Sequence, residues 1–187
     1  RYTELRTETA SSQAEVFAAQ FVLKLRKKRL FSSPQAFQRT LAKHVASLGK
    51  GSGRSSLGVL EREAAWVDED FADDDAWQEA TDDAVALATF SLSTLDGEAK
   101  DLLKRLQAWA EKASAKADAR AATLIKWLTD TVKPGGTWGD RRAIVFTEYR
   151  DTQGWLHGLL DRAGLAEDGR LAILYGGMKL EDREQVK

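Results

Sequence analysis

Apolar residues in the first part of the chain recur at the spacing of an α-helix. Phe17, Phe21 and Leu25 are each four residues apart, and neighbouring apolar residues widen the stripe. Such a stripe is typical of a surface helix that packs one side against a core. The pattern therefore predicts an amphipathic helix over residues 12–30.

A second helix is predicted directly after the first. Ser33 precedes Pro34, and this pair favours a helix start because serine accepts hydrogen bonds from free amides and proline fits the first turn. The apolar stripe then resumes and ends near Gly49, a residue type that commonly terminates helices. Residues 49–56 are rich in glycine and serine, and this composition predicts a linker. A phosphate-binding loop is not predicted there, because the stretch lacks the GxxxxGK[ST] spacing.

The middle of the chain predicts three more helices. Two lie between Trp77 and Lys116, and a third covers residues 118–132 until the sequence Lys-Pro-Gly-Gly at 133–136 ends it. The acidic run 73–75 predicts a solvated helix start and not a magnesium site, because no apolar strand precedes it.

Three tryptophans occupy the apolar stripes of these and later helices. They are Trp109, Trp127 and Trp155. Large aromatic side chains in such stripes usually contribute to a core. We therefore expect all three in the core and not on a surface that stacks on nucleic-acid bases.

The period of the pattern changes after residue 136. Residues 142–147 and 171–175 are short apolar runs, each suited to a buried parallel strand. A helix is predicted between them at residues 153–163, and Leu180 opens another. Strand, helix, strand, helix is a βαβα unit. The expected fold class is therefore mostly α with a partial α/β unit, whose two strands leave a sheet edge exposed.

Composition narrows the classes of protein that the chain can represent. Of 187 residues, 43% are hydrophobic and 30% charged, which is typical of a soluble globular protein. The absence of cysteine excludes disulfides and thiolate chemistry, and two histidines leave little for a histidine-based metal site. The chain shows no signal-peptide pattern and no apolar run near the roughly 20 residues of a membrane helix. We expect a cytoplasmic location and no membrane partner.

The net charge of −1 conceals two oppositely charged blocks. From Lys24 to Arg54 there are only basic charged residues, whereas from Glu61 to Asp83 the acidic residues face a single arginine, Arg62. Three interpretations of the basic block stay open: contact with a phosphate backbone, pairing with the acidic block, or simple solvation.

Four stretches together resemble one protein family. The helix predicted over residues 118–128, the sequence RAIVFTEYRDT at 142–152 and the sequence LYGGMKLEDR at 174–183 resemble the start of the second RecA-like domain of Swi/Snf-type superfamily 2 DNA translocases. The sequence KKRLFSSPQAFQRTL at 27–41 resembles a basic helical element between the two motor domains. This element is typical of the RapA (HepA)-like branch, which includes the helicases of DISARM-type phage-defence systems.

The resemblance implies a division of the chain and a set of DNA contacts. Residues 1–117 would be the helical region between the motor domains, and residues 118–187 the start of the second, RecA-like domain with an incomplete βαβα unit. The implied contacts with the DNA backbone are Thr147, Tyr149, Gly176, Gly177 and Arg183, with Lys27, Lys28 and Arg29 as auxiliary electrostatic contacts.

The resemblance also implies ATP and magnesium as cofactors of the whole motor. The present residues include no phosphate-cradling loop and no acidic pair after a strand for magnesium. We therefore expect this part of the motor to bind neither cofactor and to hydrolyse no ATP by itself. Its expected partners are DNA, the rest of the motor and a second copy at the sheet edge. The alternative is a non-catalytic helical module that binds another protein.

Overall fold

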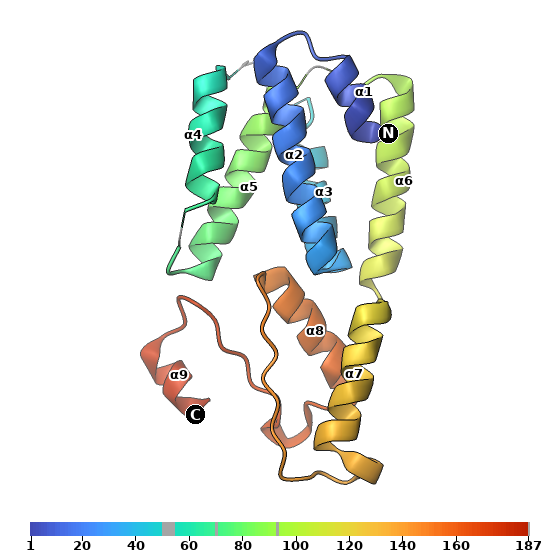
Figure 1. The fold of residues 1–187 in the computed structure, drawn as a ribbon, viewed down its shortest axis with the longest axis vertical. Helices are drawn as coiled ribbons and strands as arrows, with labels where there is room; N and C mark the ends of the chain where they lie inside the picture. The colour runs from blue at the N-terminus through green and yellow to red at the C-terminus, as the bar shows by residue number, and fades with distance from the viewer. Residues whose placement is uncertain (50–54, 70, 93, 187) are drawn as a thin grey trace.

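The computed structural model describes residues 1–49, 55–69, 71–92 and 94–186. This part of the chain forms nine α-helices, two short 3₁₀ turns and no β-strand (Figure 1). The helices are α1 Tyr2–Glu8, α2 Gln13–Ser32, α3 Pro34–Ser47, α4 Leu57–Val67, α5 Asp74–Phe90, α6 Gly97–Ser114, α7 Ala119–Val132, α8 Arg150–Arg162 and α9 Leu180–Gln185.

The first six helices form a bundle, and the last three lie at one end of it. In Figure 1, α2, α3 and α5 occupy the middle of the bundle, with α4 on one side and α1 and α6 on the other. Below the bundle, α7 continues the line of α6, and α8 lies beside α7. The loops around α8 carry the chain across to α9.

The predicted βαβα unit is wrong, because the described residues are all-α. Residues 142–147 and 171–175 follow an irregular path and pair with no strand in this part of the chain. Ile144 and Phe146 are 80% and 90% exposed, so the first run is not buried either. A strand gains its hydrogen bonds only from a neighbouring strand, and an isolated pair is marginal in water. The expected sheet edge is therefore also absent from the described residues.

The helix predictions are confirmed, and local capping explains the observed ends. Ser12 accepts a hydrogen bond from the Glu15 amide at 3.2 Å, and Ser33 accepts one from the Ala36 amide at 3.1 Å. Aspartates cap α5, α6 and α7 in the same way. Gly49 has a φ of +75°, a conformation that glycine adopts at little cost after a helix. Residues 50–54 of the predicted linker lie outside the described residues.

The apolar clusters divide the described chain near residue 116. Three clusters lie in the bundle and include residues such as Leu41, Val22 and Val85. Two others contain only residues from Ala117 onward and centre on Trp155 and neighbouring leucines. No cluster joins the two groups within the part that the structure describes. The two parts are therefore held together by other interactions.

A buried chain of hydrogen bonds crosses the bundle core and fixes the protonation of His44. The Thr89 hydroxyl donates to a carbonyl of its own helix, so it accepts from His44 Nδ1 at 2.8 Å. His44 Nε2 then accepts from the Tyr2 hydroxyl at 2.7 Å. Burial, together with the positive charges of Arg26 and Arg6, lowers the pKa of His44 to about 3. The imidazole is therefore neutral, and its two ring nitrogens are both engaged.

Candidate functional site

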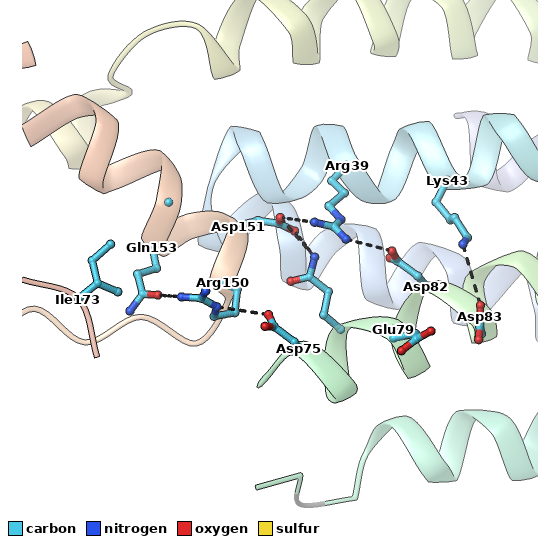
Figure 2. Close-up of a pocket in the computed structure, with 12 residues that line it drawn as sticks. Arg39, Lys43, Asp75, Glu79, Asp82, Asp83, Arg150, Asp151, Gln153 and Ile173 are labelled. Atoms are coloured by element: carbon cyan, nitrogen blue, oxygen red, sulfur yellow. Dashed lines mark hydrogen bonds and ion pairs between the residues drawn. The ribbon is translucent and has the colours of Figure 1, made fainter. Parts of the chain in front are cut away.

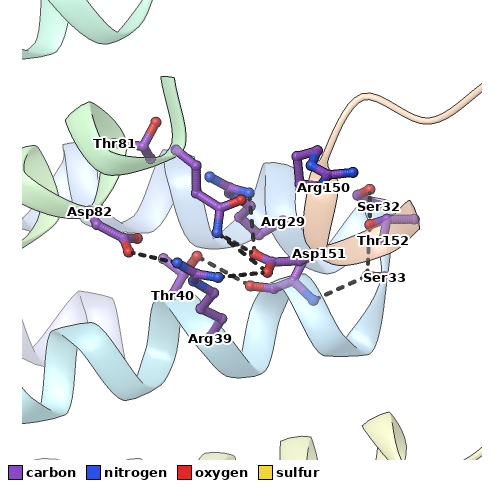
Figure 3. Close-up of polar contacts among 12 residues, drawn as sticks. Arg29, Ser32, Ser33, Arg39, Thr40, Thr81, Asp82, Arg150, Asp151 and Thr152 are labelled. Atoms are coloured by element: carbon purple, nitrogen blue, oxygen red, sulfur yellow. Dashed lines mark hydrogen bonds and ion pairs between the residues drawn. The ribbon is translucent and has the colours of Figure 1, made fainter. Parts of the chain in front are cut away.

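The N-terminus of α8 meets the bundle through a group of charged side chains. We call Arg29, Arg39, Gln78, Asp82 and Asp151 the Asp151 cluster; it joins α2, α3 and α5 to α8 (Figure 3). Asp151 accepts from Arg39 Nη1 at 3.2 Å, and its other oxygen lies 3.7 Å from Arg29 Nη1. Arg39 also lies 3.5 Å from Asp82. One carboxylate thus links two arginines from different helices.

Arg29 is the buried member of this cluster. Its side chain is 2% exposed, and its guanidinium lies over the rings of Tyr149 and Trp77, at 4.2 Å and 5.1 Å from their centres. Its Nε and Nη1 make no hydrogen bond within the described residues. Burial lowers the pKa of Arg29, and the charge of Asp151 opposes that shift. The two aromatic faces and one carboxylate therefore replace the water around this cation.

Neutral polar groups complete the junction. The Gln78 amide lies between Asp151 and Arg39. In one orientation its Nε2 donates to the Asp151 carboxylate at 3.3 Å, and in the opposite orientation its Oε1 accepts from Arg39 Nε at 2.8 Å instead. The Thr152 hydroxyl lies 2.6 Å from that of Ser32 and 2.8 Å from that of Ser33. Because Ser33 also caps α3, the start of α8 is tied directly to the boundary between α2 and α3.

Tyr149 closes the junction on the side of α8. It is buried, and it stacks on Trp77 with ring centres 5.3 Å apart. Burial first, and then the charge and hydrogen bond of Glu148, raise the pKa of Tyr149 to about 12. The phenol is therefore neutral at physiological pH and serves as a packing surface for Arg29.

A cleft of about 620 Å³ opens beside the Asp151 cluster, between α3, α5 and α8 (Figure 2). Cations and carboxylates alternate along its walls and pair across it. Arg150 Nε lies 3.4 Å from Asp75, and Lys43 lies 4.0 Å from Asp83. The cations of the cleft are thus already neutralised by residues of α5.

The walls of this cleft do not fit the triphosphate of ATP. The cleft presents carboxylates such as Glu79 and Asp83 to any triphosphate, and like charges repel. No group of three or more histidine, aspartate or glutamate side chains in this part of the chain is arranged to hold a metal ion. We therefore derive no chemical step through either cofactor.

The structure separates the predicted auxiliary contacts on α2. Lys27 is exposed and has no ion pair within the described residues, whereas Lys28 lies 3.7 Å from Asp68. Arg29 is buried in the Asp151 cluster and does not face solvent. Only the first two are therefore accessible to a ligand in this conformation.

The predicted contacts after residue 142 also occupy different environments. Thr147 is half-buried, Tyr149 is enclosed by the junction, and Arg183 is exposed on α9. Gly176 donates its amide to Asp74 at 2.8 Å, and Gly177 lies against the carboxylate of Asp73. The glycines expected to approach a phosphate thus approach the acidic start of α5 instead.

Pairing within the chain accounts for much of the basic block. Lys24 lies 3.2 Å from Asp68, and the contacts of Lys28, Arg39 and Lys43 described above also reach the acidic block. Of the three interpretations of the basic block, intramolecular pairing is therefore present for these four residues. Exposed pairs of this kind stabilise a fold weakly, by about 0–1 kcal/mol each.

The tryptophan prediction is confirmed for one residue and wrong for two. Trp155 is 9% exposed and donates its indole N–H to the Ser114 carbonyl at 2.8 Å. Trp109 and Trp127 are 48% and 53% exposed. Only part of each indole packs against the apolar side of its helix, because no further layer covers α6 and α7 at this edge.

The residues that form the junction carry no clear signal in the sequence. Asp151 and Arg39 were part of the resembling stretches without any assigned role, and Gln78 and Trp77 stood only within a predicted helix. The only signal in the sequence is the excess of cations in the basic block and of carboxylates in the acidic block. Charge balance predicts pairing but not the partners, since those are 112 residues apart in the case of Arg39 and Asp151.

Comparison with protein-family models, curated proteins and solved structures finds no match to this chain. Among the helices that the structure describes, none has both the length and the apolar character needed to cross a bilayer. The residues and geometry of this chain are therefore the basis on which its function can be inferred.

Proposed function

We propose that this chain is part of an ATP-dependent DNA translocase or helicase of the Swi/Snf type. Its role would be to contribute sequence-independent contacts with the DNA backbone, and the compartment we propose is the cytoplasm. The described residues contain no sheet, so the proposal keeps the helical contacts and not the βαβα unit that the resemblance implied.

One observation carries the proposal: two of the stretches that separately resemble this family are in contact. Arg29 and Arg39, from the stretch 27–41, both reach Asp151, from the stretch 142–152. These stretches are about 110 residues apart, and nothing in the resemblance required them to touch. This junction supports a role for the helical region as a brace for the segment that follows it.

DNA binding measured by fluorescence anisotropy tests the proposal. The probe is a labelled 20-base-pair duplex of mixed sequence, titrated between 50 and 200 mM salt. We expect a dissociation constant of about 10⁻⁴ to 10⁻⁶ M that weakens steeply with salt and does not depend on sequence. The chain alone should release no phosphate from ATP, because it lacks the motifs that hold the nucleotide.

A single charge reversal locates the contact. Lys27→Glu should weaken duplex binding and lower the magnitude of the salt slope by about 0.9. Lys100→Glu, a reversal of another exposed lysine on α6, is the matched control and should leave duplex binding close to that of the original chain. Equal effects of the two variants would show that Lys27 does not contact the duplex.

The second candidate function is a non-catalytic helical module that binds a protein. It is favoured by the large apolar side chains on the surface, which include Phe31 at 73%, Phe146 at 90% and Leu180 at 75% exposure. This candidate predicts a folded chain with no affinity for the duplex at 50 mM salt. The anisotropy experiment therefore separates the two functions.

A further inference from the structure

Four cations without an ion pair within the described residues lie on a different helix from the one that the sequence singled out. Between Lys100 and Lys133 there are eight lysines and arginines and four acidic residues. On α6, Lys100, Lys104, Arg105 and Lys112 are exposed and have no ion pair within the described residues. The stretch 100–133 therefore has a net charge of +4, from eight cations and four acidic residues, although the whole chain has a net charge of −1. Helix α6 itself, which also contains Glu98, Asp101 and Glu111, has a net charge of +1.

Three of the α6 residues form one stripe. Arg105, Trp109 and Lys112 are spaced i, i+4 and i+7, so they lie one above another along the same face of the helix. All three are exposed, and the Trp109 indole is 48% accessible. An aromatic surface thus lies between two unpaired cations.

The indole of Trp109 is held in place from below. It packs edge-on against Phe37 of α3, with ring centres 5.8 Å apart at an angle of 70°. Phe37 itself is buried in the bundle core. The contact with Phe37 holds the Trp109 indole in place in the free protein. A ligand that binds the exposed part of the ring therefore does not have to order it.

We infer that the stripe of Arg105, Trp109 and Lys112 binds single-stranded nucleic acid. The cations match the phosphate charges, and a half-exposed indole offers a face on which a base can stack. Bases in a duplex are stacked on each other and do not offer that face, so the stripe selects single strands. The inference shares with the proposed function only the class of ligand, since none of these residues belongs to the resembling stretches.

The test compares two double charge reversals on the same helix. Arg105→Glu with Lys112→Glu removes the cations of the stripe. The control, Lys100→Glu with Lys104→Glu, makes the same charge change away from the stripe. Lys100 is nine residues, or about two and a half turns, from Trp109, so it lies on the opposite face of α6. The probe is a labelled oligomer of 20 deoxythymidines, with circular dichroism to verify that both variants remain helical.

The stripe variant should bind the oligomer about tenfold more weakly, and its salt slope should fall in magnitude by about 1.4. The control variant should bind almost as the original chain does. Equal losses in the two variants, or none in either, would overturn the inference. An equal affinity for a labelled 20-residue polyglutamate would also overturn it, in favour of an acidic protein partner.

Substitution of the indole separates stacking from charge. Trp109→Ala should weaken oligomer binding about tenfold, whereas Trp109→Phe should restore much of it. An unchanged affinity in Trp109→Ala would contradict a stacking role. Lys27→Glu distinguishes this site from the proposed duplex contact: it should spare binding of the oligomer, and the stripe variant should spare binding of the duplex.

Discussion

Two buried side chains show how strongly single residues depend on their partners in this protein. Arg29 keeps its charge in a site closed by Tyr149 and Trp77, and Asp151 is the carboxylate that balances it. His44, in contrast, is neutral because its environment is positive as well as buried. The same physical effect, desolvation, is thus offset at one residue and decisive at the other.

Asp151→Asn should destabilise the fold by about 3 kcal/mol, because it leaves the Arg29 cation buried without a counter-charge. The free energy of unfolding in urea measures this change. The double variant Arg29→Met with Asp151→Asn should be more stable than Asp151→Asn alone, since it buries no charge. A neutral effect of Asp151→Asn would show that the aromatic rings suffice to hold Arg29.

The stability of the bundle should depend on pH through His44. Its pKa of about 3 in the fold lies below the ordinary value of 6.5, so between these values the unfolded chain binds a proton that the folded chain does not. Stability therefore falls as the pH falls from 6.5 toward 3, and the loss from pH 7 to pH 5 is about 2 kcal/mol.

The variant His44→Gln tests this assignment. It removes the titrating group, so the difference in unfolding free energy between pH 7 and pH 5 should shrink by about 2 kcal/mol compared with the original chain. The carboxylates are the same in both proteins and cancel in the comparison. An unchanged pH dependence would contradict a buried neutral histidine.

At the scale of elements, the first turn of α5 organises the last part of the chain. Its carboxylates contact three separate groups: Asp74 accepts from the Gly176 amide, Asp75 pairs with Arg150, and the capping residue Asp73 lies against Gly177. Negative charge is favourable at a helix N-terminus, so the acidic turn both stabilises α5 and docks the segment around Gly177.

Gly177→Ala should weaken this docking. Gly177 has a φ of +85°, and an added Cβ would lie 2.7 Å from the Asp73 carboxylate carbon, so the variant should lose about 1–2 kcal/mol of stability. Gly154→Ala is the matched control, because Gly154 lies within α8 with open space around it, and it should gain about 0.5–1 kcal/mol. Urea unfolding compares both with the original chain, and a neutral Gly177→Ala would contradict the docked position.

At the scale of the whole molecule, two apolar centres are joined by mainly polar contacts. The bundle clusters end before residue 116, and the Asp151 cluster, the Thr152 hydroxyl and the Gly176 amide cross the boundary. The Trp77–Tyr149 stack is the aromatic part of this interface. Such an interface depends on charge and geometry more than on buried apolar area.

A chain that ends at residue 116 should therefore fold without the rest. Its three apolar clusters are complete within the described residues, so it should keep a helical circular dichroism spectrum and unfold cooperatively on heating. The complementary segment from residue 117 should be less stable, because its apolar residues Ile144 and Phe146 are exposed. An unfolded 1–116 segment would contradict this division.

The sequence by itself determined most of the described helices, although not α1 and α4, because the signals that specify them are local. Apolar residues at 3.6-residue spacing, with Ser12, Ser33 and Asp118 as caps, lie within a few residues of the structure that they specify. The apolar runs at 142–147 and 171–175 carry a local strand signal. A strand nevertheless requires a partner from elsewhere in the chain, and the described residues supply none.

Only the tertiary structure decided which charges pair and which aromatic residues remain exposed. The sequence showed a basic and an acidic block, but the pairing of Arg29 and Arg39 with Asp151 depends on how α8 meets the bundle. The exposure of Trp109 likewise depends on whether another layer covers α6. Electrostatic pairing and burial depend on distances in space between residues far apart in sequence, and local spacing does not encode those distances.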